Sequence, residues 1–487
     1  MTDEPTAAAA QDNIVQLDAD QKTVIDTSEI DLSMRFASLH ENDIKYVGQW
    51  SRWLCYNGRS WDIDHSMKTY ESAKQMLVKI AKRMYNAEMH ARTGDIDKLG
   101  LSDRDKKNQH KTARKEALKI AKAVKGSKTV AAVVSLSRSD PKFITVGELW
   151  DSNPWLLNTP DGTINLKTGY VRDHNHRDFI TMSTAVGPSA RSPERWLEFM
   201  RTITDGDEML QGYLQRVLGY CLSGQVGEHA MFFGFGTGAN GKSVMLNTIG
   251  GLLGDYHKIM AMETLIITQE YRHPTELADL RGARMVTASE TQKGRSWDEV
   301  KVKHLTGGDK VKARFMRQDF FEYKPQFKLF VAGNHKPAIT SVDEAMRRRF
   351  NLIPFTVTIP AAQRDPYLAD RLKAEWPQIL NWMIEGCLEW QQHGLQPPLA
   401  VIDATDIYMS LEDSFTAWFN ECCEHDISAF TLVSKLYDSW SKWNTKNSER
   451  PGSKKSFSQT ILGKAEALKI RYRRGTDGRG FDGVAIK

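Results

Sequence analysis

Residues 235–243 read FGTGANGKS and lie between a short apolar run, 230–233, and an amphipathic stretch from residue 244. They fit the pattern G-x-x-x-x-G-K-[ST], in which backbone amides surround phosphates, the lysine reaches the terminal phosphates and the hydroxyl holds Mg²⁺. A chance glycine-rich turn is the alternative, but the flanks predict strand, loop and helix, the context that phosphate binding needs. The sequence therefore predicts a site for ATP and Mg²⁺ formed by Gly236, Thr237, Gly238, Ala239, Asn240, Gly241, Lys242, Ser243 and Val244.

Length and composition are those of an ordinary globular protein with several domains. The chain has 487 residues, 40% of them hydrophobic, and about 100–200 residues usually make one domain. No apolar run approaches the ~20 residues that cross a bilayer, and the amino end has no leader pattern. We therefore expect no membrane partner and a cytoplasmic location, in the bacterial host if a phage encodes the protein. The cysteines are scattered without a C-x-x-C pair, which predicts reduced thiols.

Positive charge is concentrated in two segments, although the net charge is only +5. Residues 101–128 and residues 450–487 each carry ten Lys or Arg against three acidic residues. A solvated helix face and a nucleic-acid surface explain the first segment about equally well, because charged helix faces are common. The second segment, which contains RYRRG at 471–475, is the stronger candidate for nucleic-acid binding.

The order of patterns along the chain predicts four parts. Residues 1–38 have the composition of a disordered tail, and 39–192 form a mixed or helical accessory domain with helices over 67–90 and 103–125. Residues 193–396 form an α/β domain, since strands at 230–233, 285–288, 329–332 and 350–355 alternate with helices and so favour a central parallel sheet. Residues 401–487 form a small winged-helix-like module, in which helical stretches at 414–425, 432–444 and 456–468 precede a terminal hairpin.

Aromatic residues gather in two clusters of the accessory domain. The first surrounds an Asn57-Gly58 hairpin turn, and the second lies between 149 and 171. Core packing is favoured over base stacking, because tryptophan usually serves as core. In the first cluster Asp62 and Asp64 alternate as strand residues do, so a two-metal polymerase site is a weak alternative.

Hydrolysis of a nucleoside triphosphate also needs a carboxylate, a polar phosphate sensor and a cation. Glu290 ends the strand MVTASE and is placed to polarise water and bind Mg²⁺, and Asn334 ends the strand KLFVAGN as the sensor. Arg347, Arg348 and Arg349 precede the last strand and suit an arginine finger. Ser289 precedes Glu290 in place of a second carboxylate, which leaves the division between metal binding and water activation open.

The order of these motifs resembles the superfamily 3 helicase core of phage, plasmid and poxvirus primase-helicases, a branch of the AAA+ ATPases. The resemblance rests on GTGANGKS, MVTASE, KHLTGGDKVKARF, FKLFVAGNHKP and RRRFNLIPF, and extends over most of the chain after residue 40. It implies a P-loop AAA+ core in a ring, hexameric in the family, that unwinds DNA. Lys242, Glu290, Asn334 and Arg348 or Arg349 would be catalytic, with Ser243 and Glu290 at the metal.

The resemblance also implies a DNA-gripping loop in the ring channel, at Lys303, Lys310, Lys312 and Arg314, around a Gly307-Gly308 turn. The expected function is an ATP-dependent replicative helicase of a phage or other mobile element. Its partners would be single-stranded and forked DNA, copies of itself, and a separate primase or polymerase, because no primase domain is evident. The alternatives are an origin-binding initiator that uses ATP as a conformational switch and a DNA-packaging or nucleotide-kinase enzyme.

Overall fold

The computed structural model describes residues 26–268, 275–289, 295–316, 319–339, 342–447, 451–476 and 478–487. Contacts divide the chain into two compact units, which we describe separately. Unit 1 comprises Met1–Trp150 and Asn175–Thr181, and unit 2 comprises Asp151–His174 and Met182–Lys487. The segment 151–174, expected in the amino-terminal domain, thus lies in unit 2. Within the described ranges, no helix is both long and apolar enough to cross a membrane.

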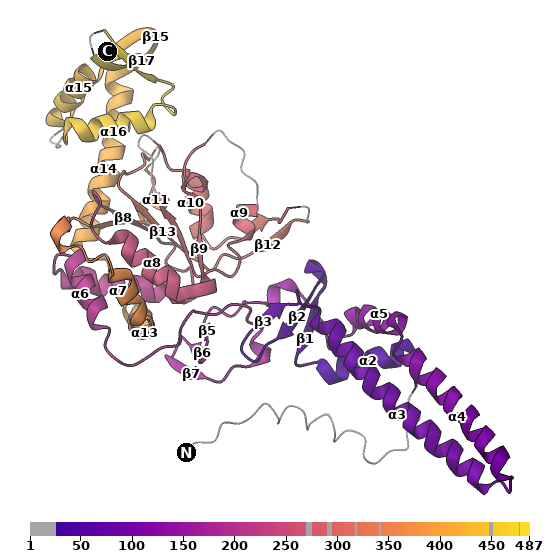
Figure 1. Cartoon of the computed structure of the whole chain (residues 1–487). Helices are drawn as coiled ribbons and strands as arrows, with labels where there is room; N and C mark the ends of the chain where they lie inside the picture. Colours follow the sequence, from indigo (N-terminus) through magenta and orange to yellow (C-terminus); the bar gives the residue numbers. More distant parts are fainter. Residues whose placement is uncertain are drawn as a thin grey trace. The chain divides into compact units, whose positions relative to one another are not determined.

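Unit 1 combines a small sheet with a long helical hairpin (Figure 1). The sheet has the order β3-β2-β1-β4, with antiparallel pairs except β1–β4. The helices at 67–90 and 103–125 are confirmed as α3 and α4. The elements are α2 (Glu29–His40), β1 (Ile44–Val47), β2 (Arg52–Tyr56), β3 (Trp61–Ile63), α3 (Lys68–Lys98), α4 (Asp103–Val124), α5 (Ser127–Leu136) and β4 (Ile144–Thr145).

Helix α2 begins inside the stretch that was predicted to be a disordered tail. The Ser28 side chain accepts a hydrogen bond from the Asp31 amide at 3.2 Å and so caps the helix. Leu32 and Phe36 follow at helical spacing and are fully buried. The prediction was wrong for residues 29–38, because two apolar side chains per turn are a weak signal until a core is present to bury them. Residues 1–25 lie outside the described ranges.

The first aromatic cluster is core, as the sequence favoured. Trp61 is 1% exposed, and its ring meets that of Trp150, a 3% exposed residue of the second cluster, edge to face at 5.5 Å. The two acidic residues of the same strand region have structural roles. The Asp62 carboxylate accepts a hydrogen bond from the Asn57 side chain at 2.8 Å, and the Asp64 carboxylate accepts from the Lys68 amide at 2.8 Å. Asp64 therefore caps the start of α3.

A five-stranded parallel sheet forms the centre of unit 2, as the alternation of strands and helices predicted. Its order is β14-β8-β13-β10-β9, and every neighbouring pair is parallel. The strands are β8 (Met231–Phe235), β9 (His257–Ile259), β10 (Met285–Ser289), β13 (Lys328–Gly333) and β14 (Phe350–Pro354). Their near-continuous apolar sequence is explained by helices on both faces, because a parallel sheet buries both of its sides.

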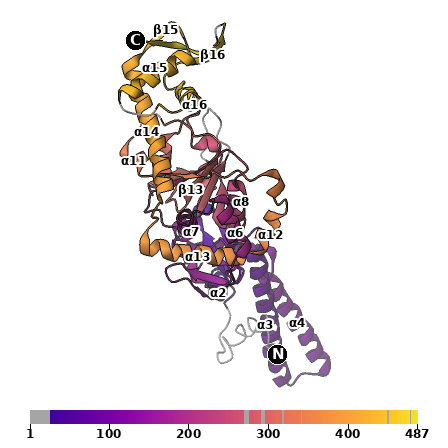
Figure 2. The same cartoon turned by 90° about the vertical axis from the view of Figure 1, so that its left-hand side faces the viewer.

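Alternate residues along these strands pack into two hydrophobic cores, one on each face of the sheet. Phe232 and Phe330 pack with the helices α6, α7, α8 and α13, whereas Phe233 and Val331 pack with α10 and part of α14. Figure 2 shows α14 continuing past the sheet into the carboxyl-terminal module. The helices are α6 (Glu194–Ile203), α7 (Glu208–Leu222), α8 (Lys242–Leu253), α9 (Thr275–Ala278), α10 (Glu299–Thr306), α11 (Glu344–Arg347), α12 (Leu368–Ala374), α13 (Trp376–His393) and α14 (Leu399–Cys422).

Three smaller sheets complete unit 2. The strands β5 (Leu156–Thr159), β6 (Gly162–Asn165) and β7 (Tyr170–Arg172) form one, and the hairpin β11 (Val311–Ala313) and β12 (Phe321–Tyr323) forms another. The buried Arg284 guanidinium joins the first of these to the central sheet. It donates hydrogen bonds to the carbonyl oxygens of Asn153 and Pro154, both at 3.0 Å, which satisfies groups that strand pairing leaves open.

The carboxyl-terminal module packs helices against a three-stranded antiparallel sheet of order β15-β17-β16. Besides α14 it contains β15 (Cys423–Leu432), α15 (Val433–Lys446), α16 (Lys454–Lys464), β16 (Arg471–Gly475) and β17 (Gly478–Ile486). The terminal hairpin is confirmed. The helix predicted through residue 425 ends earlier, at Cys422, because Cys423–Leu432 pairs with β17 in a strand that separates the two helices.

Candidate functional site

The glycine-rich loop, residues 236–241, joins β8 to α8 at the carboxyl edge of the parallel sheet. A side chain at Gly236 would overlap the Phe355 carbonyl oxygen and the Asn240 amide. Gly241 has φ +82°, and a side chain there would overlap Ile203 of α6. Glycine is therefore required at both positions, by close approach at the first and by close approach and a left-handed backbone at the second.

Asn240 fixes the loop to the neighbouring strand. Its side-chain nitrogen donates to the Phe355 carbonyl at 3.1 Å, just after β14, and its side-chain oxygen accepts from Lys242 Nζ at 3.1 Å. Asn240 is only 3% exposed. The backbone of Ala239 accepts a further bond from the Ile359 amide at 2.8 Å. Hydrogen bonds with the segment after β14 thus hold the loop in place, while Thr237 and Ala239 remain exposed to solvent.

Lys242 is a buried ammonium group among neutral oxygens. Its Nζ donates to the Gly236 carbonyl at 3.0 Å and reaches the side-chain oxygen of Asn334 at 3.4 Å. In the described part of the chain, no carboxylate forms an ion pair with it. Burial lowers the pKa of this lysine to about 8, since a low dielectric disfavours the charged form. An anion at the loop would raise this pKa again, because it favours the charged form.

The arrangement fits a polyphosphate. The first-turn amides of α8 have no carbonyl partners within the helix and carry the positive end of its dipole. Ser243 is exposed in that turn, where its hydroxyl could ligate a divalent cation. The glycine cradle, the uncompensated ammonium and the helix start all favour negative charge at one place. Lys242, Ser243 and the loop amides are therefore the residues that could hold phosphate oxygens and a metal.

The strand β13 brings a further predicted residue to this edge. Gly333 at the end of β13 pairs with Phe235 at the end of β8, which places Asn334 beside the loop. Glu290 follows Ser289, the last residue of β10, but Glu290 lies outside the described residues. Lys336 was missed by the sequence argument. Its Nζ lies 4.5 Å from the centre of the Phe235 ring. The sequence signal for this lysine is its place in the pattern NHKP directly after the strand.

The three arginines lie at the amino ends of the parallel strands, whereas the loop lies at their carboxyl ends. They precede β14, whose first residue pairs with the first residue of β8, and a strand of this length spans about 13–17 Å. Arg349 is 8% exposed and donates to the Ala345 carbonyl at 2.8 Å. Arg347 lies 3.8 Å from Asp406. Arg348 is exposed, and the described residues contain no ion-pair partner for it.

The residues predicted to grip DNA are separated by the fold. Lys303 lies on α10, forms an ion pair with Asp343 and lowers the pKa of that carboxyl. Gly307 and Gly308 end α10, so they are a helix terminus and not a loop tip. Lys312 and Arg314 lie on the β11–β12 hairpin instead.

An aromatic ring accompanies the basic residues of this hairpin. The Phe320 ring is 48% exposed and lies 5.0 Å from Lys312 Nζ and 4.6 Å from Arg314 Cζ. An exposed ring between two cations can stack on a base while the cations meet phosphates. Phe320 was not predicted from the sequence, although aromatic and basic residues alternate through KARFMRQDFFEY.

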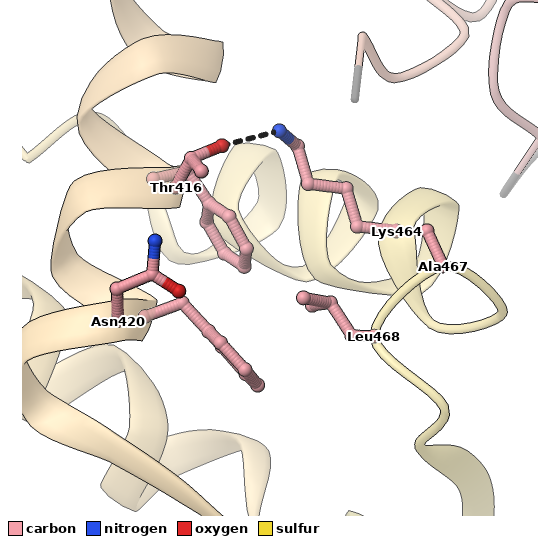
Figure 3. Close-up of a pocket in the computed structure, with 7 residues that line it drawn as sticks. Thr416, Asn420, Lys464, Ala467 and Leu468 are labelled. Atoms are coloured by element: carbon pink, nitrogen blue, oxygen red, sulfur yellow. Dashed lines mark hydrogen bonds between the residues drawn. The ribbon is translucent and has the colours of Figure 1, made fainter. Parts of the chain in front are cut away.

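A buried ion pair connects the carboxyl-terminal module to the segment after Asn334. Lys464 Nζ of α16 lies 3.3 Å from the Glu412 carboxylate of α14, and both side chains are at most 5% exposed. The same carboxylate accepts a hydrogen bond from the Ile339 amide at 3.1 Å. Figure 3 shows Lys464 directed toward Thr416, its hydroxyl partner at 3.1 Å, beside a small cavity.

Two families match the chain. One, described as "D5 N terminal like", matches residues 33–205, and the other, a "family of unknown function (DUF5906)", matches residues 235–349. "Putative helicase L207/L206" of Acanthamoeba polyphaga mimivirus is 30% identical over 336 residues, 63% of this chain and 34% of the relative. "Putative helicase 022R" of Frog virus 3 (isolate Goorha) is 28% identical over 270 residues, 49% of this chain and 27% of the relative.

The chain spans about a third or less of the length of these viral relatives. The apo structure of the NrS-1 C terminal region, in its A form, covers 91% of this chain and 96% of its own, with a TM-score of 0.45 at 8% identity.

The fold and the site define a class, the parallel α/β proteins with a glycine-rich loop between a strand and a helix. Within that class, the two family matches and the viral relatives support a phage or viral primase-helicase-like family, as the order of the motifs predicted.

Proposed function

We propose that this protein is an ATP-dependent replicative DNA helicase of superfamily 3, with a P-loop AAA+ core. The observation that carries the proposal is Lys242, a buried ammonium at the start of α8 whose hydrogen-bond partners among the described residues are neutral oxygens. A lysine held in this way has an unmet preference for an anion. The similarity to two viral proteins named as helicases supports the choice of a motor among the enzymes that bind ATP.

In the proposed reaction the loop amides and Lys242 hold the phosphates, and Asn334 orients the attacking water or the γ-phosphate. Mg²⁺, held through Ser243 and Glu290, would neutralise charge on the phosphate oxygens. Glu290 also polarises the water that attacks the γ-phosphate. Catalysis of this kind depends on positioning and charge more than on covalent chemistry.

The arginine finger must come from a neighbouring subunit. Arg348 lies near the amino ends of the strands, whereas the loop of its own chain lies at their carboxyl ends. It is therefore too far away to touch the same nucleotide. Its exposure suits a role at an interface, where such a residue can be worth 10³–10⁵ in rate. Arg349 is buried and its pKa is lowered by burial and by Arg348, so we assign the finger to Arg348. This geometry favours a ring of copies, hexameric in the proposal.

DNA contacts are proposed at two places. The β11–β12 hairpin would meet a single strand in the ring channel through Lys312, Arg314 and Phe320. The carboxyl-terminal module is proposed as a winged-helix-like DNA-binding element, because it combines α15 and α16 with a basic hairpin that starts at Arg471.

Unwinding of a forked duplex tests the proposal. The protein should separate the strands with ATP and Mg²⁺ and fail with a non-hydrolysable analogue, and Lys242→Ala should abolish both hydrolysis and unwinding. Arg348→Ala should assemble but not hydrolyse, and activity should return in mixtures with Lys242→Ala, since each subunit then supplies what the other lacks. Turnover by Lys242→Ala at the normal rate contradicts the proposal. Hydrolysis without any unwinding favours the initiator that uses ATP as a switch.

A further inference from the structure

The outward face of α4 gathers positive charge, and none of the helix's own acidic residues lies within that face. Helix α4 contains eight basic residues. At about 100° per residue, seven of them fall within a sector of about 140°, opposite the buried alanines at 113 and 117. The seven are Arg104, Lys107, Lys111, Arg114, Lys115, Lys119 and Lys122. The helix's three acidic residues, Asp103, Asp105 and Glu116, lie outside this sector.

Within the described ranges, the charges on this face also have no ion-pair partner on neighbouring elements. Among the described residues, the ion pairs that α4 makes use His110 with Asp97 and Glu116 with Arg92, and none uses the seven basic side chains. Arg104, Lys107, Lys111, Arg114, Lys115, Lys119 and Lys122 are all exposed.

The partner helix α3 shows what a merely solvated surface helix looks like. It mixes signs along its length, with Glu71 paired to Lys74 and Glu88 paired to Arg92. Such pairs stabilise a helix, whereas like charges three or four residues apart destabilise it. In α4, Lys107, Lys111, Lys115 and Lys119 repeat every fourth residue. A helix that tolerates this repulsion is best explained by a polyanion that relieves it.

We propose that this face of α4, the seven basic residues named above, binds the phosphate backbone of duplex DNA. Its basic residues extend over about 27 Å of helix, or about eight base pairs. Leu118 is the one apolar side chain within the sector, so the face lacks the apolar centre of a typical protein interface. Sequence-independent contact with phosphates suits such a surface. The proposal does not depend on ATP hydrolysis, since binding is measured without nucleotide.

The test measures binding of the full-length protein to a blunt duplex of about 30 base pairs by fluorescence anisotropy, between about 50 and 200 mM salt. The variant K111Q/K115Q/K122Q keeps helix-forming side chains. It should lose about tenfold or more in affinity at low salt, and the slope of log K against log salt should fall by about 3. The matched control, K79Q/K82Q/R83Q, removes the same charge from exposed positions of α3 and should leave that slope unchanged.

A rescue variant separates charge from folding. K111R/K115R/K122R restores the charge, so it should bind as the wild type does. Equal losses in the α3 and α4 variants would show a general charge effect and overturn the proposal. An unchanged slope in the α4 variant would overturn it too, and would leave an acidic protein as the partner. A loss just as large for a single strand of the same length would overturn the assignment to duplex DNA.

Discussion

In the proposed site, Lys242 should make the affinity for nucleotide depend on pH. Burial lowers the pKa of its side chain to about 8 in the free site, and bound phosphates would raise it again by favouring the charged form. Above pH 8 the lysine must therefore take up a proton when ATP binds. Affinity should be nearly constant below pH 7 and fall about tenfold for each pH unit well above 8.

The expected size follows from the protonated fraction of the free lysine. That fraction is about 0.9 at pH 7 and about 0.1 at pH 9 for a pKa of about 8, so the dissociation constant should rise about tenfold, or about 1.4 kcal/mol. Calorimetry with a slowly hydrolysed ATP analogue, in two buffers of different ionisation enthalpy, should find about 0.9 proton taken up at pH 9.

Lys242→Arg is the matched control, because a guanidinium stays charged throughout this range. Its affinity, whatever its absolute value, should not change between pH 7 and pH 9. If the wild type binds equally well at both values and takes up no proton, then the ammonium group does not contact the phosphates and the proposed site is wrong.

Three further predictions concern the glycine cradle, the buried ion pair and a buried lysine. Gly236→Ala should lose nucleotide binding at least tenfold, because its methyl group would meet backbone, whereas Gly227→Ala, with open space around it, should bind normally in the same titration. Glu412→Ala should cost about 3–5 kcal/mol in urea unfolding, because Lys464 is left buried and unpaired, and replacing both residues with apolar ones should cost much less. Additive losses in that double-mutant cycle would refute the coupling. The pKa of Lys328 falls to about 7 through burial, so the unfolded chain binds more protons above pH 7. Unfolding free energy relative to K328M should therefore rise with pH from 7 to 9, by up to about 1.4 kcal/mol per unit, and a falling difference would contradict the assignment.

Local patterns were sufficient for the central sheet and the loop. The apolar runs at 230–233 and 329–332 became β8 and β13, and the stretch after the loop became α8. Such segments are predictable because a continuous apolar run and a 3.6-residue period are both visible in residues that are close in the sequence. The same patterns placed Lys242 and Asn334 at one edge, since parallel strands end together.

Features that depend on distant partners could not be predicted. The Gly307-Gly308 turn looks like a loop tip in the sequence, but its role as a helix end is set by the packing of α10. Strand β15 is strand only because β17, more than 50 residues later, pairs with it. Asn240 resembles any other loop residue until the Phe355 carbonyl is beside it. For β15 and Asn240 the deciding group lies far away in the sequence.

The contact between α16 and the central domain limits how parts of this protein can be exchanged. Ser296 donates a hydrogen bond to the Gly463 carbonyl at 2.6 Å, and Gly463 has no room for a side chain beside Ala338. Anyone who grafts the carboxyl-terminal module of a relative onto this chain must therefore transplant the matching surface at 295–296 and 337–339 as well. A chimera that joins the two parts at residue 398 alone would have a poorly matched interface between α16 and residues 295–296 and 337–339. That mismatch would displace the segment that follows Asn334.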